Sequence, residues 1–187
     1  DLKFTNKHMV YFGANVNMTN FGGDLWFTGA TESANGVTVN GAVKARHLDF
    51  DDDAFMTINT TGSVTCTSDT FTTDDNSKVI IKTSNSASGA LIAKNATGDI
   101  NLQFVKTLDD GGEWTLIGVP VTGETVADID DNLLTQGGNS AIAVYDNSQG
   151  DYVHYATNAN TALVAGKGYA IAPSGSSGTA DITFTGT

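Results

Sequence analysis

The sequence predicts an all-β fold with at most one or two short helices. Three observations lead to this prediction. Thr, Ser, Asn, Gly and Asp dominate the 187 residues, and Val, Ile and Phe are interleaved among them, a mixture that favours strands and tight turns over helices. Short apolar stretches alternate with polar residues in a period of two. Clusters of Asn, Asp, Gly and Ser then separate these stretches, as turns do between strands.

The first segment, residues 2–12, runs from partial alternation into a continuous apolar patch. Chain ends are normally polar and frayed unless something holds them. We therefore expect this segment to pair with a sheet, either its own or that of a neighbouring molecule. A turn at residues 20–24 and a strand at 25–28 follow it.

The middle of the chain predicts short strands at close spacing, separated by turn clusters, at 37–39, 43–45, 55–58, 64–66, 79–81 and 90–92. Regular short strands of this kind favour a β-sandwich of the jelly-roll type. A parallel β-solenoid is the alternative for this N-terminal half, if successive strands stack as coils. We find no strict repeat period, which favours the sandwich.

Further strands are expected in the second half, at 100–105, 114–121, 141–145, 152–156, 168–172 and 182–184. No linker or low-complexity segment interrupts the chain. We therefore expect a strand-rich region over residues 1–107 and a β-sandwich-like region over 108–187, packed against each other.

One short helix is expected near residues 124–134. Thr122 or Thr125 can cap the helix, because a threonine hydroxyl satisfies the first unpaired N–H groups. Val126, Ile129 and Leu133 then repeat at helical spacing, which places them on one face.

Charge and cysteine content exclude several classes of protein. Asp and Glu outnumber Lys and Arg by 21 to 9, which gives a formal net charge of −12. Such a surface repels nucleic acid, so we expect no nucleic-acid partner. No apolar run approaches the length of a membrane span, so we expect no membrane insertion. The single cysteine, Cys66, alternates with Val64 and is expected to be buried, with a reactive or intermolecular thiol as the alternative.

Four motifs follow one another in the C-terminal half, Trp114-x-Leu-Ile-Gly-x-Pro120, Ala141–Asp146, Gly166-x-Gly-Tyr169 and Ile182–Gly186. This series resembles the W-x-L-I-(G/S)-x-P…Y…G-x-G-Y…F-x-G pattern of the β-rich C-terminal region of secreted and cell-surface proteins of Bacteroidota. The resemblance covers residues 108–187, and it departs from the commoner form at Val119-Pro120-Val121, where Asn-Pro-Tyr or Ser-Pro-Val often stands. It implies an extracellular or cell-surface location and a β architecture, and it transfers no catalytic residues.

No catalytic constellation is evident, so we expect a protein that is not an enzyme and has no cofactor. The sequence contains neither a G-x-S-x-G nor an H-E-x-x-H motif, and its three histidines are far apart. Nothing singles out two of the 21 carboxylates as the pair that glycoside hydrolysis requires.

Two acidic segments begin like a calcium loop, with carboxylates at Asp49, Asp51 and Asp53 and at Asp128 and Asp130. A calcium-binding EF-hand also requires glycine at loop position 6 and an acidic residue at position 12. These positions hold Ala54 and Thr60 in the first segment and Leu133 and Asn139 in the second, so neither is an EF-hand. An oxygen-lined calcium site of another kind stays open, beside the alternative of solvated surface carboxylates.

The apolar N-terminal segment predicts self-assembly. The chain begins Asp1-Leu2-Lys3, without methionine or a signal sequence, which is typical of a mature or processed chain. A strand lent to a neighbour satisfies an open sheet edge and builds a head-to-tail polymer. We therefore expect a structural, extracellular protein that forms a surface filament or adhesive (adhesin) fibre by strand exchange, through Leu2, Phe4, Met9, Val10, Tyr11 and Phe12. Pairing of these residues within their own sheet is the alternative.

A glycan-binding module of a secreted surface protein is the alternative function. Aromatic side chains can stack on sugars, and the candidates are Trp26, Trp114, Tyr152 and Tyr155. In alternating strands, such residues can instead form core contacts and cross-strand pairs.

Overall fold

The computed structural model of the chain describes residues 2–5, 10–13, 17–18, 21–28, 36–51, 54–67, 71–73, 77–94, 96–97, 101–108, 112–174 and 180–186. These residues are dominated by strands, which confirms the all-β prediction. The helical residues among them form α1 (Val126–Ile129) and the short 3₁₀ helix η1 (Asp130–Asn132), within the range predicted for the helix. The chain divides into two compact units, residues 1–103 with 187 and residues 104–186.

The first unit is built from three sheets, and their strand pairs between described residues are parallel. Sheet one contains β1 (Leu2–Thr5), β4 (Leu25–Thr28), β7 (Leu48–Asp51), β10 (Phe71–Thr73) and β13 (Ala96–Thr97). In this unit, sheet two contains β2 (Val10–Phe12), β5 (Val37–Val39), β8 (Phe55–Ile58) and β11 (Lys78–Thr83). Sheet three contains β3 (Asn17–Met18), β6 (Ala42–Ala45), β9 (Ser63–Cys66) and β12 (Ala90–Ala93).

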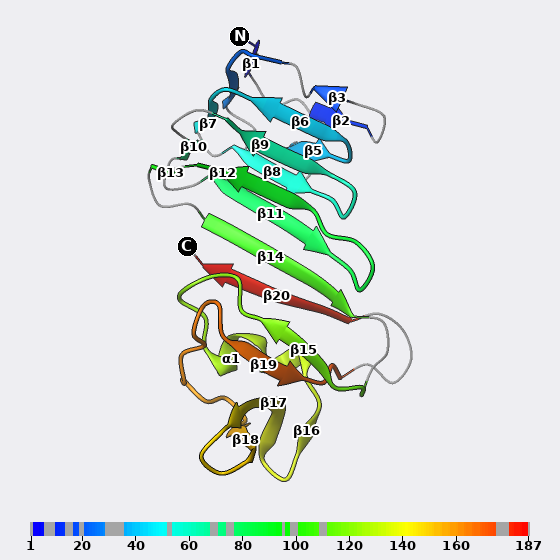
Figure 1. The fold of residues 1–187 in the computed structure, drawn as a ribbon, viewed down its shortest axis with the longest axis vertical. Helices are drawn as coiled ribbons and strands as arrows, with labels where there is room; N and C mark the ends of the chain where they lie inside the picture. Colours follow the sequence, from blue (N-terminus) through cyan, green and yellow to red (C-terminus); the bar gives the residue numbers. More distant parts are fainter. Residues whose placement is uncertain are drawn as a thin grey trace. The chain divides into compact units, whose positions relative to one another are not determined.

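The chain visits these three sheets in turn, so each coil adds one strand to each sheet (Figure 1). This arrangement is the parallel β-solenoid that was the alternative for the N-terminal half, and it corrects the preference for a sandwich there. The physical reason is that neighbours in sequence lie in different sheets and meet at corners, whereas a sandwich of hairpins pairs them antiparallel.

A regular repeat is present in sheet one. Leu25 pairs with Leu48, and Phe27 pairs with Phe50, so the motif Leu-x-Phe of one coil stacks on that of the next; β1 carries the same motif, whereas β10 does not. The leading positions of four coils are 23 residues apart, at Leu2, Leu25, Leu48 and Phe71. Sheet two has no such constancy, because its paired residues Val10, Val37, Met56 and Val79 are unevenly spaced.

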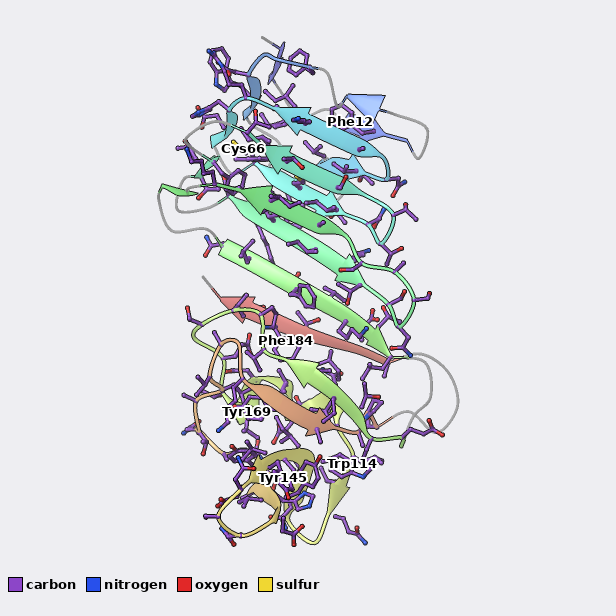
Figure 2. The ribbon with its side chains drawn as sticks, in the orientation of Figure 1. Phe12, Cys66, Trp114, Tyr145, Tyr169 and Phe184 are labelled. Carbon is purple, nitrogen blue, oxygen red and sulfur yellow. The ribbon has the colours of Figure 1, made fainter. Side chains whose placement is uncertain are left out.

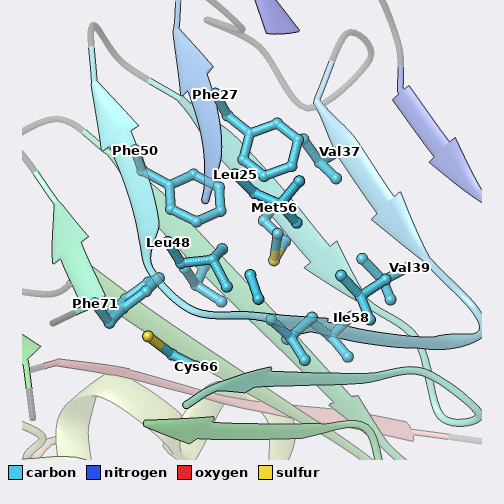
Figure 3. Close-up of a cluster of buried hydrophobic side chains, with 14 of the residues drawn as sticks. Leu25, Phe27, Val37, Val39, Leu48, Phe50, Met56, Ile58, Cys66 and Phe71 are labelled. Atoms are coloured by element: carbon cyan, nitrogen blue, oxygen red, sulfur yellow. The ribbon is translucent and has the colours of Figure 1, made fainter. Parts of the chain in front are cut away.

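The solenoid interior is filled by the alternate residues of its strands (Figure 3). The rings of Phe27 and Phe50 stack with centroids 5.1 Å apart, and Phe71 meets Phe50 edge-on at 5.5 Å. Cys66 is buried beside them, as predicted, and its thiol donates to the carbonyl oxygen of Arg46 at 3.3 Å. This burial makes Cys66 a core residue of the solenoid.

The corners between the sheets are tight. A Cβ atom at Gly62 would lie 2.2 Å from the carbonyl oxygen of Val39 in the coil before, so a larger residue does not fit without a backbone shift. At the same corner, the Asn59 side-chain amide donates to the Asn40 Oδ1 at 2.6 Å, which links two successive coils.

The second unit contains an antiparallel sheet of β15 (Thr115–Gly118), β19 (Gly168–Ile171), β17 (Asn139–Asp146) and β16 (Thr135–Gln136), with β18 (Asp151–Ala156) paired to β17. β14 (Asn101–Leu108), within which the two units divide, and β20 (Ala180–Gly186) are hydrogen-bonded neighbours. The core of this unit lies between α1 and the inner faces of its strands and includes Ile129, Ile142, Ile171, and the residues Tyr169 and Phe184 labelled in Figure 2.

Candidate functional site

The outer face of the sheet in the second unit has a floor of small residues. One row crosses four strands through direct pairing partners, from Leu116 on β15 to Ala170 on β19, Ala143 on β17 and His154 on β18. Directly paired residues project to the same face of a sheet. Because Leu116 is 74% exposed, this face is the outer one. The two middle strands therefore contribute alanines, whereas the outer two contribute large side chains.

Two rings meet above this floor. Trp114 lies two residues before Leu116 and is 52% exposed. Its indole contacts the imidazole of His154 edge to face, with ring centroids 5.6 Å apart and an interplanar angle of 67°. The contact spans the strands between them because the alanines of β19 and β17 leave the space above the sheet open.

The ring pair separates two open hollows, each about 460 Å³ in volume. The first lies over Ala143 and Ala170 and is bounded by Leu116, Asp151 and Tyr152. The second hollow lies over Ala141 and Ala172 and is lined by five further residues, Leu134, Thr135, Gln136, Asn139 and Ser140. Trp114 and His154 are walls of both. We call the two hollows with their shared walls the aromatic groove.

The polar wall of the second hollow is placed by a tight hairpin. Gln136 and Asn139 are direct pairing partners on either side of Gly137 and Gly138. Both glycines have positive φ, 60° and 85°, a conformation that side chains rarely adopt. The turn thus fixes the two amides next to each other at the edge of the groove.

A second aromatic pair extends the surface beside the first hollow. Tyr145 and Tyr152 are direct pairing partners, and their rings meet edge-on at 5.3 Å. Asp146 orders the turn between their strands, because the Ser148 hydroxyl, the Gln149 amide and the Ser148 N–H all donate to it. These hydrogen bonds, led by that of the Ser148 hydroxyl, lower the pKa of Asp146 to about 2. Trp114 and Tyr145 are both labelled in Figure 2.

The groove carries little charge. Asp151 contributes the one carboxylate among its lining residues, and Lys and Arg contribute none to the described walls. Lys167 lies 5.7 Å from the ring of Tyr169, which is a core residue. The other polar groups of the lining are hydroxyls and amides, which bind neutral partners through hydrogen bonds.

The structure places two of the four predicted stacking residues in the groove and the other two elsewhere. Trp114 and Tyr152 come together as walls of the groove. Tyr155 follows His154 in β18 and therefore projects to the opposite face, where its ring is 6.4 Å from that of Tyr169. Burial there, and then the nearby Tyr169, raise the pKa of Tyr155. The fourth residue, Trp26, lies in β4 of the first unit.

His154 is one of the groove residues that the sequence did not single out, and it is the one that contacts Trp114. Its neighbours along the chain contain no metal-binding or catalytic pattern. The one available signal was the alternation of Tyr152 and His154 on one face of a strand, which indicates a shared face but gives no partner across the sheet.

The described residues among the predicted calcium ligands belong to separate elements of the chain. Asp49 and Asp51 lie in β7, and Asp53 lies outside the described residues. Asp128 accepts from the Thr125 N–H at 2.8 Å and from its hydroxyl at 2.6 Å, so it caps α1, and this bonding lowers its pKa, with the hydroxyl as the larger cause. Buried Asp130 accepts from the hydroxyl of Ser140 and the N–H of Asn158. Within the described part of the chain, no group of three or more His, Cys, Asp or Glu is placed to hold a metal ion.

The residues predicted for strand exchange lie in strands of the chain's own solenoid. Leu2 and Phe4 belong to β1, which pairs with β4, and Val10, Tyr11 and Phe12 belong to β2, which pairs with β5. The sixth residue of that set, Met9, lies outside the described residues. These ladders correspond to the alternative in which the N-terminal segment pairs within its own sheet.

No protein family, curated protein or solved structure matches the chain. In the described part of the chain, no helix has the length and apolar character needed to cross a membrane. A functional interpretation therefore depends on the residues of the groove and on their chemistry.

Proposed function

We propose that the second unit is a glycan-binding module of a non-enzymatic extracellular protein. The observation that supports this proposal is the aromatic groove, in which Trp114, Tyr152 and His154 stand over a floor of alanines. A sugar ring has an apolar face of C–H groups and a rim of hydroxyls. Flat aromatic rings match the former, and the side-chain amides of the second hollow match the latter.

Exposure of these side chains supports a binding role. Trp114, Leu116, Tyr145 and Tyr152 are each at least 44% exposed, and they lie on one face of one sheet. Exposed apolar side chains that gather in this way mark interaction sites in soluble proteins, whereas isolated ones carry no such meaning. The open shape of the two hollows fits a ligand that lies along the sheet.

Binding is proposed instead of cleavage because the described walls of the groove contain one carboxylate, whereas cleavage needs two. Glycoside hydrolysis by the usual route requires two carboxyl groups, one on each side of the scissile bond. Asp151 is the one acidic residue among the described walls of either hollow. Its Oδ1 accepts from the N–H of Tyr152 at 2.7 Å, which is a structural role.

The extracellular location is part of the same proposal, and it is supported by the Thr- and Asn-rich composition and by the motifs of the C-terminal half. Assembly by strand exchange is not part of it. The N-terminal strands β1 and β2 already have partners in their own chain, so the groove is the feature that we use to assign a function.

A comparison of two tryptophan variants tests the proposal. The full chain is screened against an array of surface polysaccharides and oligosaccharides, and positives are measured by calorimetry. We expect selective binding that Trp114→Ala abolishes and that Trp26→Ala leaves unchanged, with thermal melts confirming that both variants are folded. Binding to no glycan, or equal binding by the wild type and Trp114→Ala, would refute the proposed function.

A further inference from the structure

We infer that the aromatic groove binds an uncharged, linear glycan that occupies both hollows and passes over the Trp114–His154 pair. This inference rests on the proposed function, and it adds the charge class and the minimum length of the ligand. Three observations lead to it: the arrangement of the two hollows, the different chemistry of their walls, and the absence of lysine and arginine among the described residues that line them.

The arrangement of the hollows determines the length of the ligand. Ala170 is part of the floor of the first hollow and Ala172 of the second. Two residues along a strand correspond to about 7 Å. Each hollow, at about 460 Å³, falls within the volume range of small-molecule sites, roughly 300–1,000 Å³. A ligand that fills both therefore needs more than one sugar ring, and it has to follow the strand direction past the two rings.

The walls assign different roles to the two hollows. The first has the ring of Tyr152 and the exposed side chain of Leu116, so it offers apolar contact to the face of a sugar ring. The second has the side-chain amides of Gln136 and Asn139, so it offers hydrogen bonds to hydroxyl groups. Because Trp114 and His154 are walls of both hollows, they can contact the glycan at the point where it crosses between them.

Charge determines the class of the ligand. A carboxylated or sulfated sugar would place an anion near the Asp151 carboxylate, and the described lining residues include no Lys or Arg to pair with it. Taking an unpaired anion out of water is costly. The formal net charge of the whole chain, −12, adds repulsion of anionic polymers at longer range. A neutral glycan meets none of these costs.

A second copy of the chain is the competing occupant of this face. Flat apolar surfaces pair with each other, and Trp114, Leu116 and Tyr145 could do so. The two hollows and the amide pair favour a sugar, because a self-complementary interface would bury Gln136 and Asn139 against the same surface of the partner. The experiment below includes this competing outcome.

Calorimetry with oligosaccharides of increasing length tests the inference. The probes are gluco-, xylo- and manno-oligosaccharides of one to six units, with oligogalacturonides of matched length as the anionic series. For at least one neutral series, we expect affinity to rise at least tenfold from one unit to four and then to level off, and we expect no binding of the anionic series. We also expect the double variant Gln136→Ala/Asn139→Ala to lose roughly tenfold in affinity for four units and little for one or two.

Several outcomes would overturn the inference. The affinity could be independent of oligosaccharide length, or the oligogalacturonides could bind as tightly as the neutral series. The double variant could bind four units with unchanged affinity. The chain could also form a concentration-dependent dimer that Trp114→Ala abolishes. If glycans bind through Trp114 and one of these results is obtained, the inference fails and the proposed function stands. If no glycan binds, both fail. Gln136 and Asn139 are exposed, so the double variant is expected to fold, and circular dichroism checks this.

Discussion

Trp114 and His154 contact each other edge to face, with 5.6 Å between ring centroids, although Trp114 directly precedes β15, His154 lies in β18, and β19 and β17 run between these two strands. Such a contact requires small residues in the middle strands, and Ala143 and Ala170 meet this requirement. The alanines are therefore as much a part of the groove as the rings. This relationship leads directly to a prediction for the floor.

Enlarging the floor should close the groove. The variant Ala170→Leu places a branched side chain under the Trp114–His154 pair, so we expect it to reduce glycan binding at least tenfold and to alter tryptophan fluorescence. Ala170 is 7% exposed, so the added atoms displace the rings above it instead of projecting freely into solvent. The control is Ala93→Leu, an exposed strand position in the first unit. Unchanged affinity and fluorescence in Ala170→Leu would show that the floor does not matter.

Glycine at the solenoid corner should be indispensable. Gly62→Ala places a methyl group 2.2 Å from the Val39 carbonyl oxygen, so the backbone has to move. We expect a loss of about 1–3 kcal/mol in the free energy of unfolding, measured by urea denaturation. Gly22→Ala is the matched control, because nothing lies within 4 Å of its added methyl group. Equal stability of the two variants would contradict the close approach of successive coils.

Glu124 should make the folded state less stable as pH rises, which is the reverse of the effect of a carboxyl group whose pKa is lowered by folding. Burial raises its pKa above the ordinary 4.5, against the opposing effect of the Thr185 N–H that donates to its Oε1, while nearby Asp128 adds to the increase. The native state thus binds this proton more tightly than the unfolded state does. The resulting stability is present below pH 4.5 and is lost as pH rises through the raised native pKa.

Comparison with Glu124→Gln isolates this effect. The variant keeps an oxygen that can accept from Thr185 and cannot ionise. We expect its melting temperature relative to the wild type to increase between about pH 4 and pH 7, because only the wild type acquires a buried charge. A melting-temperature difference that is the same at both pH values would show that Glu124 titrates normally.

The N-terminal strands should stabilise their own solenoid. Deleting residues 1–12 removes β1 and β2 and leaves the edges of β4 and β5 without these partners. We expect a lower melting temperature and, by electron microscopy, no fibres formed by the full-length chain. The strand-exchange hypothesis expects the reverse, namely fibres of the full-length chain, a truncated chain that stays folded without assembling, and restored stability when the free peptide is added.

The sequence was sufficient to predict the all-β class and the short helix, since both depend on local composition and on spacing between near neighbours. The solenoid was harder to recognise. Its repeat is regular only in sheet one, at Leu25 and Leu48, whereas corners of different length shift the strands of sheet two. The 23-residue recurrence of Leu-x-Phe was the signal that could have indicated it.

The groove was only half predictable for a related reason. Trp114 and Tyr152 are aromatic and drew attention by themselves, but a lone histidine and scattered alanines do not. Ala143 and His154 become significant once the pairing across strands is known, and that pairing joins residues that are distant in sequence. A pattern of alternation identifies the face of a strand but not its neighbour.

Titration of the isotope-labelled full chain with a neutral oligosaccharide, followed by nuclear magnetic resonance, tests the central claim most directly. We predict that the largest shifts affect the Trp114 indole, the His154 ring and the methyl groups of Ala143 and Ala170, while the Trp26 indole in the first unit does not move. Shifts confined to the first unit, or no shifts with any neutral glycan that the array selects, would contradict the account.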